Sequence, residues 1–235
     1  MGTVAVSSCM PRTATTATCA LCATTLTKRQ VAAHFSDCAP AHDASSGPIK
    51  TLVRLRVEAL GAPQYWLEIE AKADSTLTSL DTILRSTWLE CCGHLSMFEV
   101  RPFRYLQVGL GSLDPFGRRD SERSMSTRIG VAFPHVGAKG TYDYDFGSTT
   151  RLAISLADVR EGRIGRSAVR MLARNDPPAW TCGVCERPAT LLCCAHETDD
   201  SPFVCAAHEK AHGCPDGAFL PVVNSPRMGV CAYAG

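Results

Sequence analysis

The chain has 235 residues, of which 45% are hydrophobic, and its formal net charge at pH 7 is only +1. This length suffices for one or two domains, and the near-zero charge argues against a protein that coats nucleic acid, because such proteins carry a strong basic excess. The sequence shows no secretory signal and no apolar run of membrane-spanning length, which predicts a soluble, cytoplasmic protein without a membrane partner.

Composition divides the chain into three predicted parts: a finger with its linker (1–48), an α+β domain (49–178) and a cysteine- and histidine-rich module (179–235). The chain contains 13 cysteines. In the cytoplasm thiols stay reduced, and closely spaced Cys and His pairs there favour metal binding over disulfides. We therefore interpret these pairs as zinc ligands.

The first part has the ligand spacing of a C2HC zinc finger. Two cysteines in a Cys-x2-Cys pair are followed, after eleven residues, by a His-x3-Cys pair, which suits one structural zinc ion. Thr27 and Gln30 form a capping box that would open a helix carrying the histidine. The predicted ligands of this N-terminal ion are Cys19, Cys22, His34 and Cys38.

The partner of this finger is left open by the sequence. Lys28, Arg29 and Gln30 stand at the start of the expected helix, where DNA-reading fingers place their base contacts. A single finger covers only about three base pairs, so a solvent-exposed helix face is the preferred interpretation. Protein docking and a local nucleic-acid contact both remain possible uses.

The middle part opens with the pattern strand, strand, helix. Apolar residues alternate over 52–59 and again over 65–70, which predicts a hairpin of two strands. An apolar stripe then runs over 77–88, predicting a helix capped by Asp74 or Ser75. These elements predict an α+β fold with a β-grasp-like mixed sheet and one main helix.

Later elements of the middle part are less regular. Residues 98–108 are extended but interrupted by a proline, which suggests an edge or a bend. The polar, arginine-rich stretch 109–128 is expected to be a surface loop. Residues 129–133 are expected to return to strand, and alternation over 142–156 predicts a further hairpin.

Four motifs occur between about residues 50 and 160. They are Pro63-x-x-Trp66-x-x-Ile69, the helix ending in Trp88, His94-Leu95-x-x-Phe98 and Tyr142-x-Tyr144-Asp145-Phe146-Gly147. Together they resemble the plasmid pRiA4b open-reading-frame-three-like family, whose members are also known as passenger "resolvase-like" proteins of mobile elements. The resemblance implies an α+β domain encoded on plasmids and transposons. It does not imply serine-resolvase activity, and the family's Asp-x-Trp is replaced here by residues 148–150. The zinc-binding segments outside this domain resemble additions found in a zinc-bearing subgroup of the family.

Two sets of residues in the middle part invite other chemistry. Cys91, Cys92 and His94 contain the minimum for a nucleophilic pair and would also suit a third metal site, but ordinary packing is favoured because neighbours in sequence seldom converge. Asp143 and Asp145 would share one face of a strand and could hold a hard cation. A solvent-facing polar row is favoured, since no third ligand is evident.

The third part contains four ligand pairs whose order resembles a B-box-type cross-brace, in which alternate pairs bind one ion. Each of two zinc ions would then have four protein ligands and no open position, as structural sites require. Cys194 could replace Cys193, and Cys231 could displace a histidine. The predicted ligands are Cys182, Cys185, Cys205 and His208 at the first site, and Cys193, His196, His212 and Cys214 at the second.

The sequence thus predicts three structural zinc ions, one N-terminal and two C-terminal, with no catalytic set and no small-molecule substrate evident. The favoured function is a non-catalytic zinc-binding interaction protein, an accessory product of a mobile element that docks a protein partner. The first alternative is a nucleic-acid regulator using the finger or the arginines at 118, 119, 123 and 128. The second alternative is an enzyme built on Cys91, Cys92 and His94.

Overall fold

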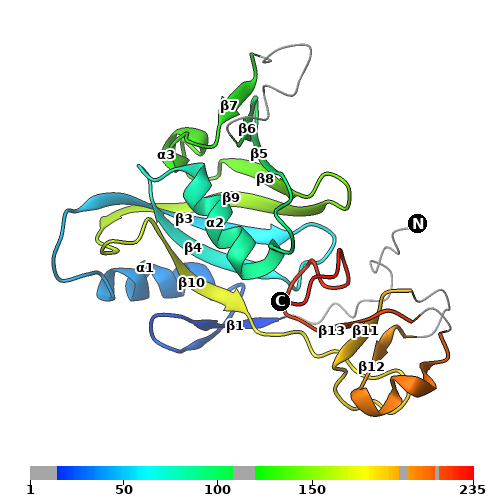
Figure 1. Ribbon diagram of the computed structural model, residues 1–235. Helices are drawn as coiled ribbons and strands as arrows, with labels where there is room; N and C mark the ends of the chain where they lie inside the picture. The colour runs from blue at the N-terminus through cyan, green and yellow to red at the C-terminus, as the bar shows by residue number, and fades with distance from the viewer. Residues whose placement is uncertain (1–14, 108–119, 196–200, 215–216) are drawn as a thin grey trace.

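A computed structural model describes residues 15–107, 120–195, 201–214 and 217–235. A ten-stranded sheet with few helices dominates it (Figure 1), so the predicted α+β class is confirmed. The strand order is β2-β1-β10-β4-β3-β9-β8-β5-β6-β7. Within the described ranges, no helix has the length and apolar character needed to cross a membrane.

The centre of the sheet is the expected hairpin. β3 (Lys50–Ala59) and β4 (Trp66–Lys72) pair antiparallel, and β9 (Thr150–Gly162) pairs with the other side of β3. Alternate side chains of β3 and β4 face one core, because successive residues of a strand point to opposite faces. The two predicted strands of the hairpin are confirmed.

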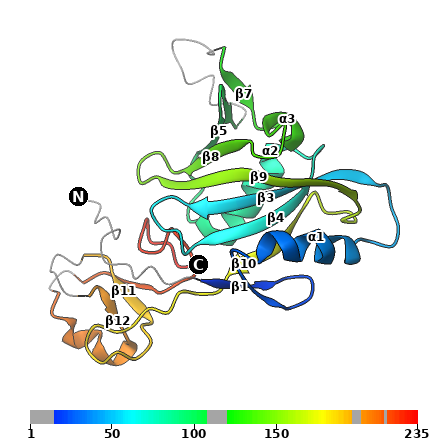
Figure 2. The same ribbon diagram turned by 180° about the vertical axis from the view of Figure 1, so that it is seen from behind.

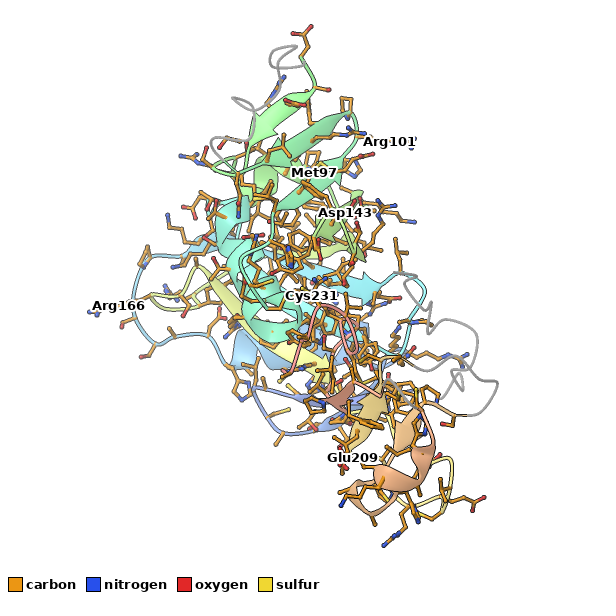
Figure 3. All side chains as sticks on the ribbon, turned by 45° about the vertical axis from the view of Figure 1, so that its right-hand side comes forward. Met97, Arg101, Asp143, Arg166, Glu209 and Cys231 are labelled. Carbon is orange, nitrogen blue, oxygen red and sulfur yellow. The ribbon has the colours of Figure 1, made fainter. Side chains whose placement is uncertain are left out.

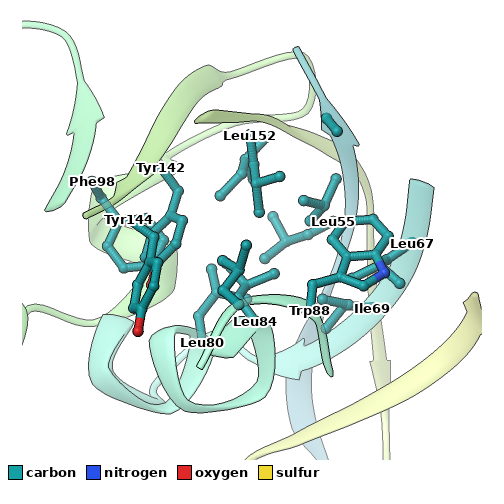
Figure 4. Close-up of a cluster of buried hydrophobic side chains, with 14 of the residues drawn as sticks. Leu55, Leu67, Ile69, Leu80, Leu84, Trp88, Phe98, Tyr142, Tyr144 and Leu152 are labelled. Atoms are coloured by element: carbon teal, nitrogen blue, oxygen red, sulfur yellow. The ribbon is translucent and has the colours of Figure 1, made fainter. Parts of the chain in front are cut away.

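The main helix covers this core. α2 (Leu77–Leu84) continues into a π-helical turn (Arg85–Leu89) that ends the predicted apolar stripe with the buried Trp88. The N-cap is Thr76, whose hydroxyl accepts from the Ser79 backbone N–H at 3.4 Å, so the expected cap at Asp74 or Ser75 was wrong. Figure 4 shows the leucines of α2 packed between Trp88 and the aromatic residues of β5 and β8.

The far side of the sheet contains β8 (Lys139–Tyr144), β5 (Ser96–Val100), β6 (Phe103–Leu106) and β7 (Glu122–Ser124). The β8–β9 hairpin was expected. β6 and β7 pair in parallel, which makes the sheet mixed.

Residues 129–133 were expected to form a strand, which is wrong. They form the short helix α3 (Ile129–Ala132), with Ile129, Ala132 and Phe133 buried. The Ile129 and Gly130 N–H groups donate to the backbone of Ser75 and Ala73, so this turn is fixed by contacts with a distant segment.

The N-terminal elements extend the opposite edge of the same sheet. β1 (Thr16–Cys19) pairs with β2 (Thr25–Thr27) on one side and with β10 (Val169–Asn175) on the other. α1 (Val31–Ala41) lies on the face opposite α2 (Figure 2). Its buried residues pack with Trp66, Leu172 and Ala173 in a separate cluster, so both faces of the sheet are covered.

The C-terminal residues form a small three-stranded sheet of β11 (Leu191–Cys193), β12 (Phe203–Val204) and β13 (Phe219–Pro221), with two 3-10 turns (Ala206–His208 and Lys210–His212). After β13 the chain returns to the central domain (Figure 1, red). We call residues 224–235 the tail; its Met228 and Tyr233 are buried, and Met228 belongs to the main core.

Candidate metal centres

The four predicted N-terminal ligands lie together. β1 ends at Cys19, the following turn carries Cys22, and α1 presents His34 and Cys38. Their ligand atoms are all within 4.8 Å of one another, with 3.5 Å between Cys22 Sγ and His34 Nε2 and 3.9 Å between the sulfurs of Cys19 and Cys38. We call Cys19, Cys22, His34 and Cys38 the N-terminal group.

The local sequence explains how α1 is placed. The Gln30 side-chain oxygen accepts from the Thr27 backbone N–H at 2.9 Å, which is one half of the expected capping box. The buried Val31 and Phe35 then fix the helix on the sheet. His34 and Cys38, one turn apart, consequently face the Cys-x2-Cys turn.

In the C-terminal module the structure brings together the first and third ligand pairs. Their ligand atoms also lie within 4.8 Å of one another. The sulfurs of Cys185 and Cys205 are 3.8 Å apart, and His208 Nδ1 lies 3.6 Å from Cys182 Sγ and 3.5 Å from Cys205 Sγ. We call Cys182, Cys185, Cys205 and His208 the C-terminal group.

The second predicted C-terminal set is only partly described, because His196 lies outside the described residues. Cys193 and Cys214 are neighbours: burial raises the pKa of Cys193, and the Cys214 thiol raises it further. The His212 ring packs edge-on against Phe219 at 5.6 Å. Cys194 belongs to none of the groups found among the described residues.

A further group, which the predicted ligand sets did not include, lies at the end of the main helix. Cys91, Cys92 and His94 follow the π-helical turn, and Cys231 of the tail joins them. Cys231 is labelled in Figure 3. Cys231 was considered as a replacement ligand for the C-terminal module, but it lies here instead, far from Glu209 in that figure. We call Cys91, Cys92, His94 and Cys231 the central group.

All three groups contain the same donors, three thiols and one imidazole. This set suits Zn²⁺, which prefers four S and N ligands in a closed tetrahedron. Carboxylates, which hard cations such as Mg²⁺ and Ca²⁺ require, are not among the donors. The residues present therefore fit a structural zinc ion.

The pKa values of the thiols within these groups are shifted in both directions. The Thr24 hydroxyl and N–H lower the pKa of Cys22 to about 6, whereas burial and the neighbouring thiols raise that of Cys38 to about 12. At Cys182 burial opposes ionisation, but backbone N–H groups and His208 lower the pKa to about 5. A bound divalent cation would offset the mutual repulsion that keeps such thiols from ionising together.

The two aspartates considered as a pair do not act together. Asp143, on β8, makes a two-pronged ion pair with Arg151 at 2.6 Å. Asp145 follows the end of β8, has a φ of 64° and pairs with Arg227 at 2.7 Å. Asp145 lies beyond the end of β8, so the shared strand face expected from the spacing was wrong. Both aspartates are buried, so the favoured solvent-facing polar row was wrong as well.

Comparison with known proteins adds little. No protein-family model matches the chain, and no curated protein matches its sequence. One solved structure, a protein of unknown function from Methanosarcina mazei Go1, is similar over 53% of this chain and 69% of its own chain, with 17% sequence identity and a TM-score of 0.42.

Proposed function

We propose that this protein is a non-catalytic zinc-binding interaction protein whose metal ions are structural. The observation that carries the proposal is the convergence of four S and N donors from the chain itself in the N-terminal and C-terminal groups. Four protein ligands leave no coordination position for a substrate or an activated water. The ions would hold binding modules in shape for a protein partner.

The C-terminal group depends most on its metal. Its cluster of buried residues consists of Cys182, Val204 and Cys205, two of which are ligands. Leu192 of β11 and Phe203 of β12 pack in the main core, so the metal matters most for the turns that carry the ligands. Structural zinc contributes about 10 kcal/mol or more in finger peptides. We propose that the full cross-brace includes a second ion held by Cys193, His196, His212 and Cys214.

The finer architecture is part of the same proposal. The motif residues Trp66, Ile69, Trp88, Phe98 and Tyr142 are all fully buried, which supports a β-grasp-like domain related to the pRiA4b family. In that case these five residues maintain the core, whereas the motif residues Leu95 and Phe146 are exposed. Repeated occurrence of the gene beside plasmid or transposon genes would test the proposed link to mobile elements.

The contacts of the finger favour a protein partner over nucleic acid. Lys28 donates to the Pro63 carbonyl at 2.6 Å, pairs with Glu58 at 3.3 Å and lies over the Trp66 ring. A lysine so engaged is poorly placed to neutralise a phosphate. Arg123 likewise donates to the backbone carbonyls of Asp120 and Glu122 and stacks on Phe103.

Zinc counting on purified protein tests the metal sites. Cys38→Ser and Cys182→Ser should each lose about one zinc per chain, because three remaining donors cannot close a tetrahedral structural site. Cys194→Ser, outside all three groups, is the matched control and should keep the wild-type content. Unchanged zinc in both ligand variants would refute the proposal.

The interaction role needs a separate measurement. Wild-type protein immobilised on beads should retain a partner from host extract, and Cys182→Ser should retain less of it, whereas Cys194→Ser should behave like wild type. Equal retention by all three proteins would show that partner binding does not depend on the C-terminal metal site.

A further inference from the structure

We propose that the central group is a further zinc site, which fastens the tail to the central domain. This site goes beyond the ions proposed above and does not depend on them. It joins the segment after the main helix to the tail, and 137 residues separate His94 from Cys231. Convergence over such a distance is set by the tertiary fold and not by local spacing.

The distances suit a tetrahedral ion. With bonds of about 2.3 Å to sulfur and about 2.0 Å to nitrogen, two sulfurs should lie about 3.8 Å apart, and a sulfur and a nitrogen about 3.5 Å apart. Cys92 Sγ lies 3.6 Å from both Cys91 Sγ and Cys231 Sγ. His94 Nε2 lies 2.9 Å from Cys92 Sγ and 3.2 Å from Cys231 Sγ, so only a small outward shift of the imidazole is needed.

Charged side chains of both signs lie beside the central group. Three thiolates and one Zn²⁺ leave a net charge of −1, which a nearby cation would offset. The fully buried Arg227 guanidinium lies near the Cys91 thiol. Arg227 also pairs with Asp145, whose carboxylate oxygen lies 3.5 Å from His94 Nε2. In the C-terminal group, Arg187 likewise lies beside a thiol, with its Nε 3.3 Å from Cys185 Sγ. Two groups with identical donors thus each have an arginine beside a thiol.

The backbone of the tail is shaped around Cys231. Cys231 and the following Ala232 have φ values of 52° and 55°, a conformation that non-glycine residues adopt rarely and mostly where the surroundings impose it. The turn directs the Cys231 sulfur at Cys92 and His94. A bound ion would supply the interaction that holds this turn.

The tail makes several other contacts that the metal would secure. Arg227 donates to Asp145 at 2.7 Å, and the Ser225 hydroxyl donates to the Trp88 carbonyl at 2.6 Å. These contacts place the tail across the end of the main helix. The exposed Cys92 and Cys231 complete the site at the surface, where an ion can enter after the chain has folded.

Zinc counting with separate variants tests the site. Cys231→Ser and Cys92→Ser alter exposed side chains and should each lose about one zinc per chain, with an unchanged far-UV circular dichroism spectrum. Combining Cys231→Ser with Cys38→Ser should lose about two. Hydrogen exchange in the tail should rise in Cys231→Ser, while exchange in β3 and β9 should stay at the wild-type level.

The outcomes distinguish this site from the others. Full zinc content in both Cys92→Ser and Cys231→Ser, with a loss in Cys38→Ser, would overturn the central site and leave the proposed function standing. A Cys92–Cys231 disulfide, detected by alkylating the non-reduced protein before peptide mass analysis, would also overturn it. Loss of zinc in both Cys92→Ser and Cys231→Ser, with full zinc content in Cys38→Ser and Cys182→Ser, would support this site and refute the others.

Discussion

Asp43 connects the end of the finger to the sheet through a network of buried and half-buried charges. Its carboxylate accepts from Arg160 at 2.7 and 3.0 Å and from the Arg163 backbone N–H at 3.0 Å. Arg160 also donates to Glu70, which is almost fully buried in β4. The network therefore helps to hold α1 and the linker on the face opposite α2.

We predict that Asp43→Asn lowers the free energy of unfolding by about 1 to 3 kcal/mol at neutral pH, since it leaves Arg160 with one fewer charged partner. The hydrogen bond from Arg160 holds the pKa of Asp43 below its usual value. The stabilisation is therefore complete above the unfolded-state pKa of about 4 and is lost as pH falls through the lower folded-state pKa.

Urea unfolding at several pH values from about 2 to about 7, a range that brackets the pKa of an aspartate carboxyl, measures this effect. The difference between wild type and Asp43→Asn should shrink toward the acid end. Asp37→Asn, on the exposed face of α1, is the control and should unfold like wild type. A difference that is independent of pH would mean that the charge of Asp43 is not responsible.

At this scale the sequence identifies ligands that are close together in the chain. Cys19 and Cys22, or Cys182 and Cys185, occupy single tight turns, so their spacing alone indicates a shared ion. Cys231 gave no such signal because its neighbours in the central group are far away in sequence. The only hint was that it remained outside the cross-brace pattern.

The strand β8 can pair with β5 only because Gly140 allows the two backbones to approach closely. A Cβ added to Gly140 would lie 2.7 Å from the Glu99 carbonyl oxygen and 2.7 Å from a Val100 methyl carbon of β5. Backbone cannot move aside as a flexible side chain can. Glycine is therefore required at the position where β8 lies closest to its antiparallel neighbour β5.

Gly140→Ala is accordingly predicted to lower the free energy of unfolding by about 1 to 3 kcal/mol through overpacking. Lys139→Ala, at the exposed start of the same strand, should have little effect. Equilibrium urea denaturation of both variants provides the comparison, and equal midpoints would show that the strands can separate without cost.

Periodicity predicted the elements with long regular patterns and failed at short ones. β3, β4 and the β8–β9 hairpin alternate over enough residues to define a buried face. The segment that forms α3 contains only five apolar and glycine residues with no clear period, and contacts with Ser75 and Ala73 decide its conformation. The pairing of β1 with β10 also joins segments that are far apart in the sequence. No local pattern of residues could therefore predict it.

For the whole molecule, the metal groups and the main core differ in what stabilises them. The main core extends from β3 and β4 through α2 to β5 and β8 and contains many large apolar side chains. The cluster at the C-terminal group contains three residues. We therefore expect metal removal to affect the two parts unequally.

Treatment with a strong zinc chelator should raise hydrogen exchange in the turn from Cys182 to Cys185 and in the 3-10 turns, while β3, β4 and β9 keep their protection. The reason is that structural zinc supplies most of the folding free energy where the apolar core is small. Exchange monitored by mass spectrometry, with readdition of zinc as the control, tests this. Equal deprotection of both parts would indicate one cooperative unit.

The pairing of β1 with β10 also has a consequence for synthesis on the ribosome. Roughly 150 residues separate the two strands, so at about 5–20 residues per second β1 waits on the order of 10–30 s for its neighbour. The N-terminal group, by contrast, is complete as soon as Cys38 has emerged. An ion captured at that moment would hold β1 and α1 together until β10 has been synthesised and pairs with β1.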